Sequence, residues 1–126
     1  MKLNPDCIRD ILICVEDLPS INYTMTFDKD SIAANLKKYS YDDVIYHLRQ
    51  CELKGFFYKT SGSFNGEYTV FDLSPAGHEF LANVRSDNVW ENVKAISSKI
   101  GSTSLTALTQ IATGVITAMI KNQLGI

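Results

Sequence analysis

The sequence predicts an α+β fold that is mostly helical: a winged helix-turn-helix followed by a C-terminal extension of two helices. Two observations support this prediction. Apolar residues recur at helical spacing in successive segments, and two β-prone runs flank a glycine-rich turn in the middle of the chain. The resulting order of helix, short strand, two helices, hairpin and helix is that of a winged helix-turn-helix. We therefore assign residues 1–84 to the winged helix and residues 85–126 to the extension.

The first helix is expected to begin at Asn4. Asn caps free amide groups, Pro5 tolerates the first helical position, and Asp6 favours the positive end of the helix dipole. Pro19 marks the end of this helix, and residues 23–27 follow as a short β-prone strand. The residues that are expected to face the core recur at helical spacing: Ile8, Ile11, Leu12 and Val15.

Two helices joined by a tight turn are expected next. The earlier of the two runs from Asp28 or Asp30 to about Lys38. The later one begins at Ser40, a good capping residue, and ends at Gly55, because a helix terminus often needs a residue in the left-handed conformation. The expected core residues of the earlier helix are Ile32, Ala33 and Leu36, and those of the later helix are Val44, Leu48 and Cys51.

A β-hairpin follows the turn at Gly55. Residues 56–60 and 68–73 are its strands, and residues 61–66 form a loop with two glycines and an Asn-Gly turn signal. Ser74-Pro75 then begins a fourth helix, which continues to about Val84.

The C-terminal extension consists of one helix over residues 87–100 and another from about Leu105 to Lys121. The second has a wide apolar stripe and no charged residue from Leu105 to Ile120, so part of its surface must be buried. Packing within the chain, self-association and membrane contact are the alternatives; a membrane span needs about 20 predominantly apolar residues, and this stretch is shorter and rich in Thr. We predict a homodimer without membrane contact. Its candidate oligomerisation residues are Leu105, Leu108, Ala112, Val115 and Met119.

Several segments resemble an uncharacterised bacterial family that is often carried by phages and prophages. They are Met1–Arg9, Tyr46–Leu48, Leu73–Arg85, Asn88–Trp90 and Lys99–Leu105. The resemblance covers nearly the full chain. It implies a winged helix and an origin in a mobile element, but it supplies no activity.

No catalytic or metal-binding pattern is found. His47 and Cys51 lie four residues apart on one helix, but a structural zinc site needs four ligands and His78 is the one other histidine. The loop 61–66 lacks the Lys-Ser/Thr pair of a phosphate-binding loop, and the chain has no Gly-x-Ser-x-Gly motif. We therefore expect a non-enzymatic protein with no metal, no cofactor and no small-molecule substrate.

The three cysteines, Cys7, Cys14 and Cys51, do not suit a disulfide scaffold, because their number is odd and their spacing is unpaired. Buried thiols in a reducing cytoplasm are the simpler interpretation. We expect the protein to be cytoplasmic, in a bacterial host cell.

Charge is the main criterion for a nucleic-acid partner. The net charge of the chain is −2, and the cations and anions of residues 40–66 are equal in number. A duplex binder draws much of its affinity from about 6–10 phosphate contacts, so a monomer is poorly equipped, whereas a dimer doubles the contacts. The candidate residues for double-stranded DNA are Tyr41, Tyr46, Arg49 and Gln50 for base edges or phosphates, and Lys37, Lys38 and Lys59 for the backbone.

A protein partner is the alternative. Aromatic residues and mixed charges suit a protein interface, and the candidate anchors are Tyr41, Tyr46 and Phe64; the two tyrosines are equally compatible with half-buried surface aromatics. The partner would be a host protein, such as a defence nuclease or the transcription machinery. The sequence therefore predicts a winged-helix regulator that binds DNA, with an interaction module or inhibitor of a host protein as the alternative.

Overall fold

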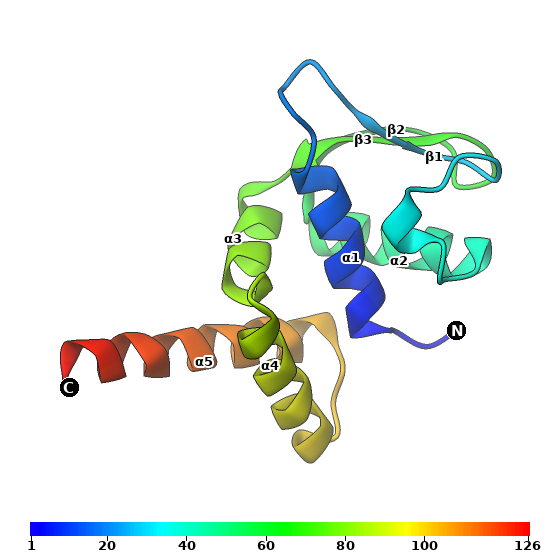
Figure 1. The fold of residues 1–126 in the computed structure, drawn as a ribbon. Helices are drawn as coiled ribbons and strands as arrows, with labels where there is room; N and C mark the ends of the chain where they lie inside the picture. Colours follow the sequence, from blue (N-terminus) through cyan, green and yellow to red (C-terminus); the bar gives the residue numbers. More distant parts are fainter. The chain divides into compact units, whose positions relative to one another are not determined.

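The structure is a computed structural model that describes residues 1–126, with five α-helices, one 3-10 helix and three strands (Figure 1). The fold is α+β and mostly helical, as predicted. The elements are α1 (Pro5–Glu16), β1 (Met25–Phe27), η1 (Ala34–Leu36), α2 (Tyr41–Lys54), β2 (Phe57–Gly62), β3 (Tyr68–Leu73), α3 (Pro75–Val84), α4 (Asp87–Ile100) and α5 (Leu105–Leu124).

The chain forms two compact units, Met1–Glu79 and Phe80–Ile126. Their boundary lies within α3, a few residues before the boundary that the sequence predicts at Val84. We refer to them as the N-terminal unit and the C-terminal unit.

α1 begins as the sequence predicts. The backbone N–H of Asp6 donates a hydrogen bond to Asn4 Oδ1 over 3.0 Å, and Pro5 occupies the first helical position. The helix packs against α2, β3 and η1. This packing forms the core of the N-terminal unit, and the buried residues of α1 are Cys7, Ile8, Ile11, Leu12, Cys14 and Val15.

The three strands form one antiparallel sheet in the order β1-β3-β2. The predicted hairpin is present, and the predicted early strand pairs with its return strand, with Phe27 opposite Tyr68. Gly62 has a φ of 101°, and a Cβ at this position would lie 2.1 Å from the carbonyl oxygen of Glu67. The hairpin therefore closes only with glycine at this position.

The helix expected from Asp28 or Asp30 to Lys38 is wrong, because only the 3-10 turn η1 forms there. Asp28 Oδ1 accepts a hydrogen bond from the backbone N–H of Asp30 over 2.9 Å and closes a local turn, but no α-helix continues from it. The Cys14 thiol then donates to Asn35 Oδ1 over 2.8 Å, which ties η1 to α1. Tertiary contacts thus replace the expected helix.

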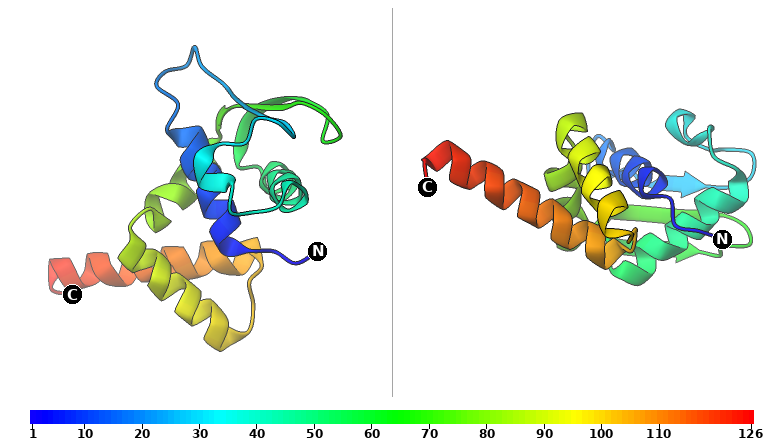
Figure 2. Two further views of the ribbon diagram at one scale, coloured as in Figure 1. Left: turned by 45° about the vertical axis from the view of Figure 1, so that its right-hand side comes forward. Right: turned by 90° about the horizontal axis from the view of Figure 1, so that it is seen from below.

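In the C-terminal unit, α4 ends at Gly101, which has a φ of 83°, and α5 begins at Ser104, whose Oγ accepts from the backbone N–H of Ala107 over 3.0 Å. The two helices pack against each other, and α5 continues past α4 (Figure 2). The residues of these helices that are buried are Val89, Trp90, Val93 and Ser97 of α4, and Leu105, Leu108 and Ala112 of α5.

This packing corrects the predicted oligomerisation surface. Leu105, Leu108 and Ala112 are buried within the chain, so they are not available to a second copy. Val115 is half-buried and Met119 is 45% exposed. The first half of the apolar stripe therefore serves intrachain packing. None of the helices combines the length and apolar character that a bilayer-spanning helix requires.

Candidate partner-binding groove

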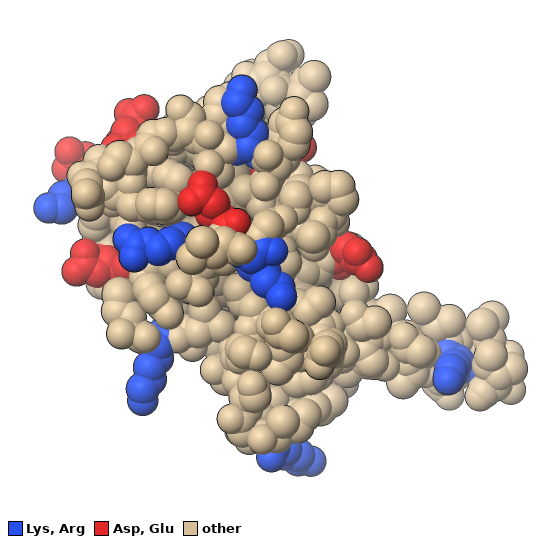
Figure 3. All heavy atoms as spheres, turned by 180° about the vertical axis from the view of Figure 1, so that it is seen from behind, with Lys and Arg blue, Asp and Glu red and all other residues tan.

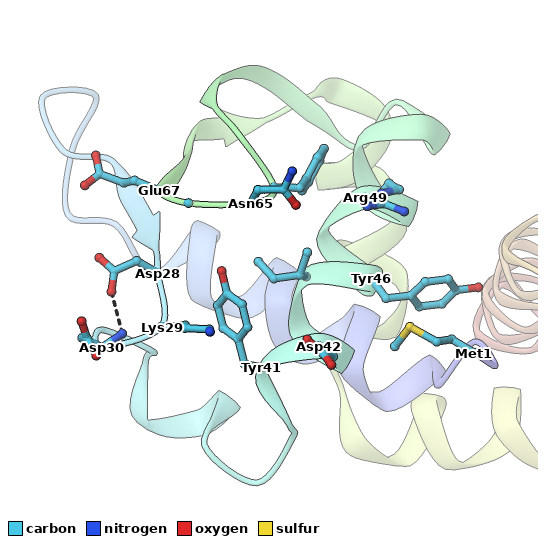
Figure 4. A pocket seen from close by; sticks show the side chains of 13 residues that line it. Met1, Asp28, Lys29, Asp30, Tyr41, Asp42, Tyr46, Arg49, Asn65 and Glu67 are labelled. Atoms are coloured by element: carbon cyan, nitrogen blue, oxygen red, sulfur yellow. Dashed lines mark hydrogen bonds between the residues drawn. The ribbon is translucent and has the colours of Figure 1, made fainter.

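A groove of about 690 Å³ lies along the outer side of α2 (Figure 4). Its walls are the outer face of α2, residues 28–30 after β1, and residues 64–67 at the hairpin tip; Met1 also contributes. We call it the α2 groove. All of its residues belong to the N-terminal unit.

The two ends of α2 are fixed by capping. Ser40 Oγ accepts a hydrogen bond from the backbone N–H of Asp43 over 3.1 Å, and Gly55 ends the helix with a φ of 83°. The inner face is buried as predicted, with Val44, Leu48 and Cys51 inaccessible to solvent. The outer face is thereby directed into the groove.

His47 fixes α2 to the start of the chain. The backbone N–H of Asn4 donates to His47 Nε2 over 2.7 Å, so Nε2 is an acceptor and Nδ1 carries the proton. Nδ1 in turn donates to the carbonyl oxygen of Asp43 over 2.6 Å. The side chain is 1% exposed and both ring nitrogens are used. His47 is therefore a hydrogen-bonded core residue.

The hairpin tip folds against α2. The Phe64 ring stacks on Tyr68, with ring centroids 4.3 Å apart, and the Arg49 guanidinium lies 5.4 Å from the Phe64 ring centroid. Tyr68 is buried beneath this stack. Thr60 Oγ1 also donates to Glu52 Oε1 over 2.6 Å, which links β2 to α2. Phe64 is therefore half-buried and forms a wall of the groove rather than an exposed tip.

The side chains that line the α2 groove carry a net negative charge. Four carboxylates, those of Asp28, Asp30, Asp42 and Glu67, face two cations, Lys29 and Arg49. Figure 4 shows Asp28, Asp30 and Glu67 toward one end, whereas Arg49 and Tyr46 lie toward the other. The end with these three carboxylates is therefore net acidic, although Lys29 lies among them, and the end with Tyr46 and Arg49 has Asp42 nearby.

The structure brings together only part of the predicted DNA-binding set. Tyr41, Tyr46 and Arg49 line the α2 groove. The other four candidates lie outside it: Lys37, Lys38, Gln50 and Lys59.

Two of these outlying lysines have partners within the chain. Lys38 Nζ lies 3.1 Å from Asp10 Oδ2, and Lys59 Nζ lies 4.7 Å from the Phe71 ring centroid. On the face in Figure 3, Lys and Arg are scattered among Asp and Glu and do not form a basic stripe. This face therefore lacks the cluster of positive charge that would attract the phosphates of DNA.

The predicted partner-binding set, in contrast, is brought together completely. Tyr41, Tyr46 and Phe64 all line the α2 groove. The sequence alone does not single out Ile45, which lies between the tyrosines, or the three carboxylates of Asp28, Asp30 and Glu67. Residues 28–30 lie beside the hairpin tip because β1 pairs with β3. The local sequence pattern does not predict that pairing.

The three cysteines are free, buried thiols, as predicted. Burial, with a smaller contribution from Asp10, raises the pKa of Cys7 to about 12. Burial likewise raises the pKa of Cys14 to about 11, although the hydrogen bond to Asn35 opposes the shift. Burial also raises the pKa of Cys51. These thiols are protonated at neutral pH and are poor nucleophiles and metal ligands. The structure groups no three His, Cys, Asp or Glu side chains in a metal-binding arrangement.

Comparison with known proteins places these features in a family. The model of the family described as Hypothetical protein (DUF2513) matches residues 2–104, which include every residue of the α2 groove except Met1 and end just before α5. The chain belongs to this family. The resemblance to an uncharacterised family is thereby confirmed.

A relative from Haemophilus influenzae, titled "Uncharacterized protein", is 29% identical over 123 residues, covering 95% of this chain and 99% of the relative. No solved structure matches the chain. Neither the DUF2513 family nor this relative carries a described activity, so the α2 groove is the basis for a functional proposal.

Proposed function

We propose that this DUF2513 chain is a non-enzymatic winged-helix protein that binds a protein partner in the α2 groove. The observation that carries the proposal is that all three predicted partner anchors line one groove whose side chains are net acidic. The partner segment that fits such a groove carries Lys or Arg together with apolar groups.

The winged-helix assignment rests on topology. A helix, a short strand, a turn of helix, a second long helix and a hairpin follow one another, and β1 pairs with β3. In a winged helix the second long helix is the recognition element and the hairpin is the wing. Here these are α2 and β2–β3, with η1 in place of the usual middle helix.

Charge on these two elements favours protein over DNA. Residues 41–73, which comprise α2 and the wing, contain five carboxylates and three cations, and the first turn of α2 contains Asp42 and Asp43. A helix and wing that approach a duplex must face phosphates, which repel carboxylates and gain affinity from cations. DNA remains the second candidate because Tyr41, Tyr46 and Arg49 lie on the solvent side of the recognition helix.

The aromatic end of the groove supplies an anchoring surface. Tyr46 is half-buried, and its ring meets the His47 ring edge-on with centroids 5.0 Å apart, so its position is fixed before binding. Rigid aromatic side chains are typical binding hot spots, since they bury much area and lose little entropy. The acidic end then selects a cationic residue on the partner.

Binding measurements on the full chain test this proposal. Selection from a random peptide library should enrich Lys- and Arg-containing peptides. Tyr46→Ala should weaken binding of a selected peptide at least about tenfold, as truncation of an anchor does. The matched control is Tyr23→Ala, an exposed tyrosine outside the groove, which should leave the affinity unchanged.

A mixed-sequence duplex, measured in parallel by fluorescence anisotropy, decides between the candidates. Binding that weakens steeply between about 50 and 200 mM salt and depends on Tyr46 would support DNA and overturn the protein proposal. Selection of acidic peptides, or equal effects of the two tyrosine substitutions, would overturn it as well.

A further inference from the structure

The C-terminal half of α5 contains no buried residue. The last buried residue of this helix is Ala112, although the helix continues to Leu124. Figures 1 and 2 show this half of α5 extending past α4. About three helical turns therefore extend beyond the α4–α5 packing.

These turns carry an apolar surface. Met119 is 45% exposed, Ile120 53% and Leu124 67%, and Val115 and Ile116 are only half-buried. At about 100° per residue, Val115, Ile116, Met119 and Ile120 share one side of the helix, whereas Leu124 lies opposite Val115. We call it the terminal α5 face. Apolar side chains exposed in succession on one face mark an interaction site.

We propose that the terminal α5 face binds the same face of a second copy of the chain. Two copies can meet there without opposing like charges, because Lys121 is the one charged residue of α5 and lies on the opposite side from Ile116. The face also continues the stripe that packs on α4, so a second α5 extends an existing helix–helix interface.

The chemistry of the face selects against the other occupants. Residues 105–120 contain no charged side chain, so a charged partner could form no ion pair with them. Helices that lie on a membrane surface carry a Lys- and Arg-rich polar face, whereas the polar side of α5 is made of Thr, Gln, Gly and Ala with a single lysine. An uncharged, apolar helix of the same kind fits best.

Self-association through α5 gives each particle two α2 grooves. Two identical binding sites in one particle raise the apparent affinity for a partner that presents two copies of its segment. This inference is independent of the proposed function, because its residues lie in the other unit.

Sedimentation equilibrium of the full chain tests the inference. The unmodified chain should form a dimer, and Ile120→Glu should raise the dimer dissociation constant at least about 100-fold, because two unpaired carboxylates would be buried. The matched control is Ala118→Glu, an exposed position on the other side of the same helix, which should remain dimeric. Circular dichroism should show equal helix content in all three proteins.

Three results would overturn the inference. One is a monomeric full chain at all concentrations tested. The second is a dimer that Ile120→Glu leaves intact, which would place the contact elsewhere. The third is equal dissociation by both glutamate substitutions, which would show a general effect of charge rather than a defined face.

Discussion

α2 and α5 each bury one side in their own unit and expose the other, but their exposed sides differ in chemistry. The outer face of α2 carries aromatic rings beside carboxylates and Arg49, within a groove. The exposed end of α5 is apolar and nearly uncharged. The exposure of both faces predicts that each is an interaction surface. The charge of each face predicts which class of partner it binds. A polar, aromatic groove suits a charged segment of another protein, whereas an uncharged face suits a copy of itself.

The largest expected effect separates the inner from the outer side of α2. Leu48 is fully buried and Leu53 is 75% exposed on the same helix. Leu48→Ala should lower the free energy of unfolding by about 2–5 kcal/mol through lost burial and a cavity. Leu53→Ala should change it by less than about 0.5 kcal/mol. Urea denaturation measures both, and similar losses would show that α2 is not oriented as described.

A second prediction concerns the polar contact that orients α2. His47→Leu removes the acceptor for the backbone N–H of Asn4, so the free energy of unfolding should fall by about 1–3 kcal/mol. His78→Leu is the matched control, since His78 is exposed and pairs only with Asp72 at the surface. We expect a change below about 0.5 kcal/mol there. An unaffected His47→Leu variant would contradict the proposed anchoring.

The smallest expected effect is a difference in alkaline sensitivity between the units. Burial raises the pKa of Cys7, Cys14, Cys51, Tyr39 and Tyr68, and all five lie in the N-terminal unit. The C-terminal unit contains neither Cys nor Tyr. Since these pKa values are higher in the folded state, folding favours the protonated groups. Their stabilisation is complete below pH about 9 and declines as the pH rises toward about 12.

Hydrogen exchange checks this difference. Amide protection in α2 should weaken between pH about 9 and 11, after correction for the intrinsic exchange rate, whereas the fluorescence of Trp90 in the C-terminal unit should be unchanged. The replacement Cys14→Ala should reduce the pH dependence of α2 protection. Equal loss in both units would contradict the account.

Much of the fold follows from local signals. Asn4, Ser40 and Gly55 act at helix ends as their chemistry predicts, and the glycine-rich turn forms the hairpin. The prediction for the segment from Asp28 to Lys38 is wrong because its conformation depends on a hydrogen bond between Asn35 and the distant Asp10, which the local sequence does not indicate. Periodicity predicts that such a segment has an apolar side but not that side-chain hydrogen bonds replace its helix.

The candidate site was predicted in part for the same reason. Tyr41 and Tyr46 were identified because they lie on the predicted outer face of one helix. The acidic end of the groove was missed because Asp28 and Glu67 are distant in sequence and meet only through strand pairing. On α5, periodicity identified the apolar stripe, but the length of α4 decided that Leu108 is covered and Met119 is not.

The central claim is that the α2 groove binds a cationic protein segment rather than DNA. Its most direct test is an NMR titration of the full, isotope-labelled chain with a selected Lys- and Arg-containing peptide, compared with a mixed-sequence duplex at low salt. We expect peptide-induced shift changes at residues 28–30, at Tyr41 to Arg49 and at residues 64–67, with α5 unaffected. Changes at these residues from the duplex alone, or peptide-induced changes confined to the C-terminal unit, would contradict it.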